Sequence, residues 1–124
     1  CQYKLQNDNG SFSSPNVLNN SYPDFQVCSW SVTVNASLRI LMKLQTMNIP
    51  NCEENYLDIY DGRHDNASTL LARFCGKNAT SGAKVTSKMN NLYIVLKSGN
   101  NYARNSGDLS KSLGFYAEYE AFEQ

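Results

Sequence analysis

Apolar and polar residues alternate along most of the chain. In residues 28–34, CSWSVTV, Ser and Thr separate the apolar positions, and in residues 38–44, LRILMKL, every second position is apolar. Alternate residues of a β-strand share one face, so each segment would bury one side in a core. Further runs rich in β-branched and aromatic residues have strand length, at residues 56–60, 70–74, 84–87, 91–98 and 114–122.

This pattern predicts an all-β fold. The pair Asp61-Gly62 has the composition of a tight turn between two strands. No segment longer than ten residues has a helical period, and the chain contains no internal repeat and no interdomain linker. Several short strands with turn signals between them therefore predict a single β-sandwich domain over residues 1–124.

The overall charge does not point to nucleic acid or to a membrane surface. The 124 residues include eleven basic and eleven acidic side chains, so the formal net charge at pH 7 is zero. The longest apolar run is short and is interrupted by Lys43, so we expect no transmembrane helix. The chain begins at a cysteine, and we expect that a signal peptide has been removed or that the domain belongs to a longer protein.

Four widely spaced cysteines indicate disulfides rather than a zinc site. Zinc sites usually need close pairs such as C-x-x-C, and none occurs here. We expect two disulfides formed in an oxidising compartment, while the spacing leaves three connectivities open. The cysteines are Cys1, Cys28, Cys52 and Cys75.

Glycosylation signals agree with an oxidising, extracellular compartment. The motif Asn-x-Ser/Thr occurs five times, in a chain rich enough in Asn, Ser and Thr for some matches to be coincidental. The candidate acceptors are Asn9, Asn19, Asn35, Asn66 and Asn78. We therefore expect a secreted protein or the ectodomain of a membrane protein.

Four segments of the chain contain motifs that occur together, in this order, in one family. Residues 10–30 contain a Gly-x-Phe-x-Ser-Pro turn, a Tyr-Pro pair and Cys-x-Trp. CEENYLDIYDG begins at the third cysteine, LLARFCG ends in Cys75-Gly76, and GFYAEY lies near the end of the chain. These segments resemble the CUB domain, an extracellular module of complement initiator proteases, tolloid-type metalloproteases, cubilin, neuropilins and spermadhesins. The chain departs from the family at Val17-Leu18, where a second Tyr-Pro pair is usual.

The resemblance implies a two-sheet antiparallel β-sandwich of jelly-roll type. It also implies sequential disulfides, Cys1–Cys28 and Cys52–Cys75. The expected role is binding without catalysis and without a cofactor. The single histidine, His64, lies in the polar segment DGRHDN, which offers no rigid framework for a Ser-His-Asp site.

Many CUB domains hold one calcium ion, and the resemblance implies three main carboxylate ligands. In this chain those positions fall at Pro50, Asn55 and Gly99, none of which has a carboxylate. Asp108 would retain the third role if the loop before it carries an insertion. Calcium prefers six to eight oxygen ligands, so we expect no calcium site. The weaker alternative is a rewired site drawn from Asn55, Asp108, Glu53 and Glu54.

The acidic run that follows Cys52 is interpreted as a solvated surface segment. On a strand through residues 56–60, Asp58 would lie opposite Leu57 and Ile59 and would point to solvent. Asp61 would belong to the turn. Acidity alone therefore does not predict a metal site in this segment.

The polar loop GNNYARNSGDLSKSL is the best local candidate for partner recognition. It is longer than most hairpin loops, and it contains Tyr and Arg, which are enriched at binding hot spots. Residues 73–111 carry a net charge of about +6, which becomes a basic surface only if the strands gather these side chains. The candidate partner-binding residues are Tyr102, Arg104, Lys97 and Lys111.

These observations predict a noncatalytic, calcium-independent glycoprotein module that binds an extracellular protein through its loops, within a larger secreted or membrane-anchored protein. One alternative is a stand-alone, spermadhesin-like secreted protein that binds glycans, acidic glycans in particular. A second alternative is a substrate-binding exosite domain of an extracellular protease. Nucleic-acid binding and direct membrane insertion are not expected.

Overall fold

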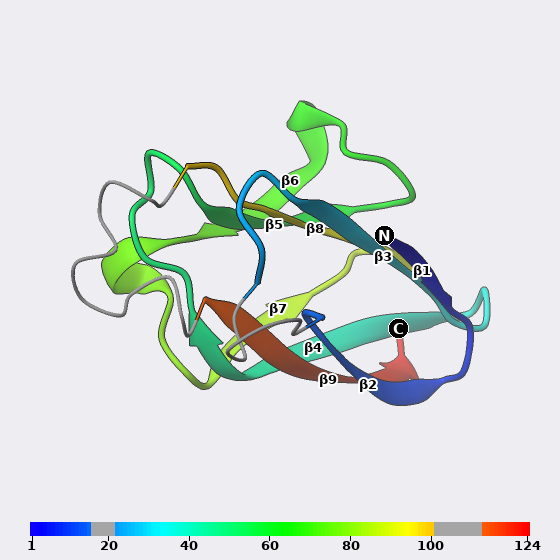
Figure 1. Cartoon of the computed structure of the whole chain (residues 1–124). Coiled ribbons are helices and arrows are strands. Elements are labelled where there is room, and N and C mark those ends of the chain that lie inside the picture. Colours follow the sequence, from blue (N-terminus) through cyan, green and yellow to red (C-terminus); the bar gives the residue numbers. More distant parts are fainter. Residues whose placement is uncertain (16–21, 101–112) are drawn as a thin grey trace.

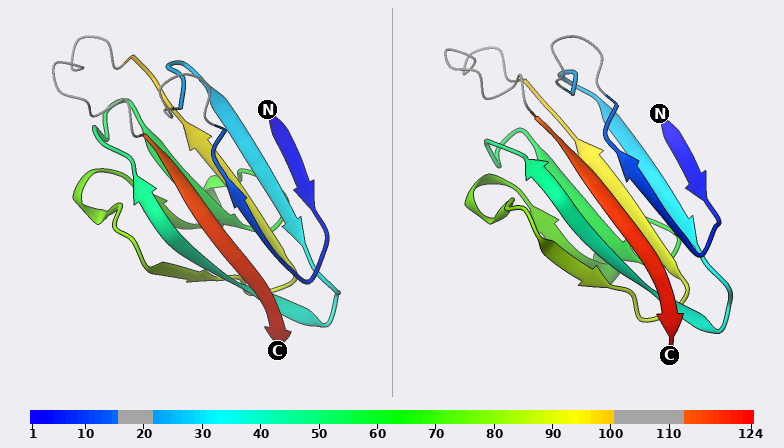
Figure 2. Two further views of the ribbon diagram at one scale, coloured as in Figure 1. Left: turned by 60° about the horizontal axis from the view of Figure 1, so that its bottom comes forward. Right: turned by 90° about the horizontal axis from the view of Figure 1, so that it is seen from below.

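Two β-sheets pack face to face, and Figure 1 shows them edge-on as an upper and a lower layer. The computed structural model describes residues 1–15, 22–100 and 113–124. Sheet A, the upper layer, has the strand order β1-β3-β8-β5-β6, and sheet B has the order β2-β9-β4-β7. The strands of sheet B run side by side across the molecule when it is viewed from below (Figure 2).

Apart from β1 and β2, the strand bounds lie close to the strand-length segments of the sequence. The strands of sheet A are β1 (Gln2–Leu5), β3 (Val27–Thr33), β8 (Asn91–Lys97), β5 (Tyr56–Asp61) and β6 (Leu70–Phe74). The strands of sheet B are β2 (Asn9–Ser13), β9 (Gly114–Glu123), β4 (Leu38–Asn48) and β7 (Ala83–Thr86). Two short 3-10 helices, η1 (Ala67–Thr69) and η2 (Gly76–Asn78), flank β6.

The core between the sheets consists of the alternate residues that the sequence pattern places on one face. Trp30 of β3 meets Phe115 of β9 edge-on, with 5.0 Å between ring centroids. Phe12 of β2 meets the same ring at 5.8 Å. Each large apolar side chain that is buried contributes about 1.5–3 kcal/mol to the free energy of folding. Side chains without exposed surface include Ile40, Met42, Leu44, Leu92, Ile94 and Leu96.

Both disulfides have the sequential pairing that the resemblance implies. Cys1 joins Cys28 with 4.7 Å between Cα atoms, and Cys52 joins Cys75 with 5.2 Å between Cα atoms. The first bridge fixes β1 beside β3. These two strands run parallel, whereas every other pair in the described sheets is antiparallel. Among the described strands, the parallel β1–β3 pair departs from the predicted antiparallel sandwich.

Three local predictions need correction. The edge strands β1 and β2 were not predicted, because both are short, β1 has no buried position and β2 has only one. The pair Asp61-Gly62 does not form a tight hairpin, since β5 ends at Asp61 and β6 begins only at Leu70. The strand predicted at residues 38–44 continues to Asn48, with a register shift against β9 between Leu44 and Thr46.

The sandwich has two distinct ends. The loop end comprises residues 22–26, 49–55, 75–82 and 98–100, and the turn end comprises residues 34–37, 62–69 and 87–90. The strand register defines this division. Val27 and Tyr56 both pair with Lys97 at the loop end, while Thr33 pairs with Asn91 and Asp61 pairs with Leu92 at the turn end.

Candidate functional site

Side-chain hydrogen bonds join three of the described loop-end segments, residues 22–26, 49–55 and 98–100. Tyr22 is buried and donates its hydroxyl to the Leu96 carbonyl at 2.8 Å, and burial raises the pKa of this phenol well above its ordinary value. The Ser98 hydroxyl accepts the Gln26 N–H at 3.0 Å and donates to the Pro23 carbonyl. Segment 22–26 is therefore tied to the end of β8.

Asn55 joins the remaining two segments. It has no exposed surface. Its Nδ2 donates to the Pro50 carbonyl at 2.7 Å, and its Oδ1 accepts the Gly99 N–H at 3.3 Å. One side-chain amide thus links residues 49–55 to residues 98–100 across a sequence separation of 44. A buried amide satisfied at both atoms stabilises these loops, because leaving either partner unpaired costs free energy.

Glu54 adds a second link between the same segments. Its carboxylate accepts the Asn100 N–H and lies so close to Gly99 that a Cβ at that position would overlap Glu54 Oε1. A side chain at position 99 would therefore displace the Glu54 carboxylate from its present position. Glu54 therefore supports the loop as an acceptor of a backbone hydrogen bond, while Glu53 is exposed.

These residues do not fit a calcium site. The three positions that the family resemblance assigns to ligands, Pro50, Asn55 and Gly99, do converge. However, the Asn55 amide is hydrogen-bonded to the backbone of Pro50 and Gly99. Proline and glycine have no side-chain oxygen. Within residues 1–15, 22–100 and 113–124, no cluster of three or more His, Cys, Asp or Glu side chains is arranged to hold a metal ion. Asp108 lies outside the described residues.

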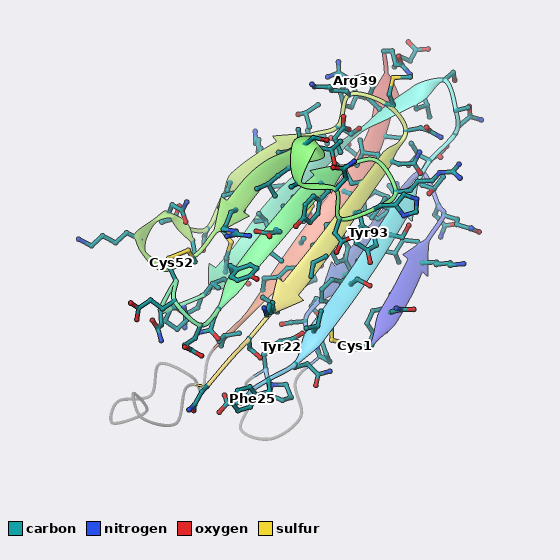
Figure 3. The ribbon with its side chains drawn as sticks, turned by 90° about the horizontal axis from the view of Figure 1, so that it is seen from above. Cys1, Tyr22, Phe25, Arg39, Cys52 and Tyr93 are labelled. Atoms are coloured by element: carbon teal, nitrogen blue, oxygen red, sulfur yellow. A yellow bond between two sulfur atoms is a disulfide. The ribbon has the colours of Figure 1, made fainter. Side chains whose placement is uncertain are left out.

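Among the described residues of the loop end, Phe25 is the most exposed large apolar residue. Its side chain is 73% exposed, and its backbone has φ +53°, a left-handed conformation that is rare for a bulky residue. The Phe25 N–H donates to the Gly99 carbonyl at 3.2 Å, so the same contacts that order the loops hold Phe25 outward. In Figure 3 Phe25 lies at the loop end with Tyr22, far from Arg39.

Three side chains form a row across sheet A, beginning at Val27, two residues after Phe25 in the chain. Val27, Lys97 and Tyr56 pair directly on β3, β8 and β5, so they share the outer face. Val27 is 55% exposed, and Lys97 Nζ lies 5.6 Å from the centroid of the Tyr56 ring. We call Phe25, Val27, Lys97 and Tyr56 the loop-end patch.

The prediction that Asp58 points to solvent is wrong. Asp58 does lie opposite Leu57 and Ile59, but it is only 1% exposed. Arg73 of β6 covers it with two hydrogen bonds, Nε to Oδ1 at 2.7 Å and Nη2 to Oδ2 at 2.8 Å. The bond to Asp58 raises the pKa of the Arg73 guanidinium.

Two tyrosines also contact the Asp58–Arg73 ion pair. The Arg73 guanidinium carbon lies 4.1 Å from the centroid of the Tyr56 ring. The Tyr60 hydroxyl donates to Asp58 Oδ2 at 3.1 Å. Burial and the neighbouring Asp58 carboxylate raise the pKa of Tyr60 to about 12. The Asp58 carboxylate therefore has a structural role, since Arg73 and Tyr60 occupy its oxygen atoms.

The structure separates the basic residues of the second half of the chain. Arg73 is paired with Asp58, Lys84 projects from β7 in sheet B, Lys88 lies at the turn end and Lys97 belongs to the loop-end patch. Of the partner-binding candidates, only Lys97 is described. Tyr102, Arg104 and Lys111 lie outside the described residues, as does the glycosylation candidate Asn19.

Two features of the loop end were not identified from the sequence. The role of Asn55 depends on a contact with Gly99, which is distant in the chain, and no local signal predicts it. Phe25 stands two residues after Pro23 in a polar context, and the only signal that marks it is an isolated aromatic residue in a polar segment.

The fold and sequence match one protein family. The family model of the CUB domain matches residues 1–118. The chain is a CUB domain. Human Tolloid-like protein 1 is 32% identical over 124 residues, which cover 98% of this chain and 11% of that protein. Cubilin homolog of Drosophila melanogaster is 29% identical over 86 residues, or 67% of this chain and 2% of that protein.

Solved structures agree with this assignment. The CUB1-EGF-CUB2 domains of rat MASP-1 superpose with a TM-score of 0.76 at 22% identity, covering 98% of this chain and 43% of that one. The MASP-1 CUB2 domain bound to Ca2+ superposes with a TM-score of 0.70 at 20% identity, covering 94% of this chain and 96% of that one. These likenesses concern the fold. The chain spans about a tenth of the length of the tolloid-like relatives.

Family membership also determines the general character of this chain. CUB domains are generally noncatalytic modules of extracellular proteins, and this domain is extracellular. The expectation of an extracellular disulfide-bonded β-sandwich is thereby confirmed. No helix among the described residues has the length and hydrophobicity needed to cross a membrane.

Proposed function

We propose that this CUB domain binds an extracellular protein partner through the loop-end patch, as a noncatalytic and calcium-independent module. The observation that carries this proposal is Phe25. A large aromatic side chain is held outward by ordered loops in an unfavourable backbone conformation, which costs about 1–3 kcal/mol. Rigid aromatic side chains supply much of the binding energy at protein interfaces.

The chemistry of the patch suggests the kind of partner. Phe25 and Val27 offer apolar surface, and Lys97 offers a cation held over the Tyr56 ring. A complementary partner surface would present an apolar pocket or side chain beside a carboxylate. Such an interface gains affinity from apolar burial and specificity from the charge pair.

Matched variants test this assignment. The domain, immobilised in its secreted form, captures partners from extracellular fluid, and the affinity of each recovered protein is then measured. Phe25→Ala is expected to weaken binding by about tenfold or more, and Lys97→Glu to weaken it further. Met89→Ala is the control, because Met89 is 60% exposed but lies at the turn end. Equal affinities for wild type and Phe25→Ala would exclude the loop-end patch.

Binding of an acidic glycan is a second candidate function. Lys43 and Lys84 stand directly opposite each other on the outer face of sheet B, where two like charges attract a polyanion. These two lysines line a shallow groove together with Glu118 and Glu120, so the face is not uniformly basic. Retention on heparin that falls with rising salt and is lost in Lys43→Ala/Lys84→Ala would favour this candidate over the first.

A further inference from the structure

Two glycosylation motifs share one local geometry. Asn35 begins the motif NAS between β3 and β4, and its Oδ1 accepts both the Ser37 N–H and the Ser37 hydroxyl at 3.1 Å. Asn66 begins a second NAS motif between β5 and β6, and its Oδ1 accepts the Ser68 N–H at 3.0 Å and the Ser68 hydroxyl at 2.9 Å. In both motifs the hydroxyl contacts the amide oxygen of its own asparagine.

The amide nitrogens of these two asparagines are accessible. Asn35 and Asn66 are both exposed, and neither Nδ2 donates a hydrogen bond within the described part of the chain. A substituent on Nδ2 would leave every hydrogen bond of the turn in place, because the turn uses only Oδ1. Both sites therefore accommodate a large polar group without a change in the fold.

Asn78 has the same motif type but a different environment. Its Oδ1 accepts the Cys75 N–H at 2.8 Å, and its Nδ2 donates to the Arg73 carbonyl at 3.1 Å. The Asn78 amide thereby joins the 3-10 helix η2 to the end of β6, beside the Cys52–Cys75 disulfide. A sugar on this nitrogen would replace one of its two hydrogens. The sugar would also have to avoid the Arg73 carbonyl, which lies 3.1 Å from Nδ2.

The motifs of Asn35 and Asn66 lie together at the turn end. Thr33 pairs with Asn91 and Asp61 pairs with Leu92, so the segments that follow β3 and β5 emerge at the same end of the sandwich. The turn end and the start of β6 beside it also have exposed apolar side chains, Met89 at 60% exposure and Leu70 at 39%. Glycans attached here would cover apolar surface and raise solubility.

We propose that Asn35 and Asn66 carry N-linked glycans that cover the turn end, while the Asn78 amide retains its structural hydrogen bonds. In the transfer, Asn Nδ2 forms a bond to C1 of the first N-acetylglucosamine of a lipid-diphosphate-linked oligosaccharide. The C1–O bond to the diphosphate breaks, the lipid diphosphate leaves, and Nδ2 gives up one proton. This inference does not rest on the proposed binding function.

Site occupancy in the secreted protein is the test. The whole chain is secreted from a eukaryotic cell line, purified as folded monomer, and treated with peptide N-glycosidase in H2 18O, which marks each formerly glycosylated Asn as labelled Asp. Mass spectrometry of the peptides is expected to show the label at Asn35 and Asn66 in most molecules and at Asn78 in few. An unlabelled Asn35 or Asn66, or equal labelling at Asn78, overturns the inference.

Variants provide a second measurement. Ser37→Ala and Ser68→Ala are each expected to lower the intact mass by one glycan, whereas Ser37→Thr and Ser68→Thr retain it. Thr80→Ala removes the Asn78 motif and is expected to leave the mass of the glycosylated protein unchanged apart from the side chain. Loss of a glycan in Thr80→Ala contradicts the assignment. Peptide labelling of the wild type decides the matter for any variant that is not secreted.

Discussion

Asn55 acts as a fixed cross-link between two loops. Its amide donates to one backbone group and accepts from another, both in a position without exposed surface. A side-chain amide suits this role because it carries a donor and an acceptor at opposite corners of one plane. A carboxylate at the same place would accept the Gly99 N–H but would face the Pro50 carbonyl without a donor.

Replacing Asn55 should therefore destabilise the domain. Asn55→Ala leaves the Gly99 N–H and the Pro50 carbonyl without their partner, and we expect the free energy of unfolding to fall by about 2 kcal/mol. Asn55→Asp is expected to lose at least as much, with or without calcium. Urea unfolding measures both changes, and Lys77→Ala, an exposed site at the same end, is the control. Stability equal to that of wild type in Asn55→Ala would contradict the cross-link.

Tyr60 gives the domain a defined response to alkaline pH. Its pKa is raised from 10.0 to about 12 in the folded state by burial and by Asp58. The unfolded chain releases this proton first as the pH rises. The stabilising effect is therefore fully present below about pH 10 and is lost between about pH 10 and 12.

Tyr60→Phe should make the alkaline loss of stability shallower. The free energy of unfolding, measured in urea at several pH values between about 9 and 11, is expected to fall less steeply with pH in the variant than in wild type. Tyr93→Phe is the matched control, since Tyr93 packs 6.4 Å from the Tyr60 ring on the same face but does not bond to Asp58. Parallel pH profiles for wild type and Tyr60→Phe would show that Tyr60 does not contribute.

At the scale of elements, the edge strand β6 is held by a charged contact as well as by its ladder. Arg73 is about half exposed, 49% at the side chain, whereas Asp58 on β5 is almost fully buried. The arginine therefore stays partly hydrated while it neutralises a carboxylate that has lost its water. Removing the arginine is more costly than removing both charges, because an unpaired buried carboxylate remains.

Arg73→Ala should loosen the β5–β6 pair. We expect a loss of about 2 kcal/mol in the free energy of unfolding, the usual range for hydrogen bonds to a charged group. The double variant Asp58→Asn/Arg73→Ala should recover part of that loss, since no buried charge is left unpaired. Native-state hydrogen exchange at residues 70–74 reports the local effect. A double variant that is less stable than Arg73→Ala would contradict this explanation.

The sequence predicted the longer strands well and the edges poorly, for physical reasons. The strands β3, β4, β8 and β9 alternate because one face of each is buried, and alternation is visible locally. The strand β1 depends on a distant partner and a disulfide, and its own burial pattern contains no buried position. The burial of Asp58 likewise depends on Arg73, fifteen positions away, rather than on strand alternation.

The same distinction applies to the candidate site. The positions at which the family resemblance expects calcium ligands were identified from the sequence, and the structure brings Pro50, Asn55 and Gly99 together. How they are joined was not predictable, because it depends on a side chain reaching across the loop end. The exposed Phe25 also depends on this arrangement, through its N–H bond to the Gly99 carbonyl.

For the whole molecule, the two ends of the sandwich have different characters. The loop end is cross-linked by side chains and by the Cys52–Cys75 disulfide, and it presents an apolar and cationic patch. The turn end carries the glycosylation motifs of Asn35 and Asn66. With a partner surface at one end and glycans at the other, the domain would bind its partner through the loop end only. The central claim is that the protein's own hydrogen bonds order the loop end without a metal ion.

Thermal unfolding with and without calcium tests this claim most directly. An extracellular calcium site with a dissociation constant near 1 mM, occupied at 10 mM calcium, would stabilise the folded state by about 1.4 kcal/mol. For a domain of this size that gain would raise the unfolding midpoint by roughly 3–6 °C. We predict the same midpoint in 10 mM calcium and in chelator, with magnesium as the ionic-strength control. A rise of several degrees that is specific to calcium would contradict the account.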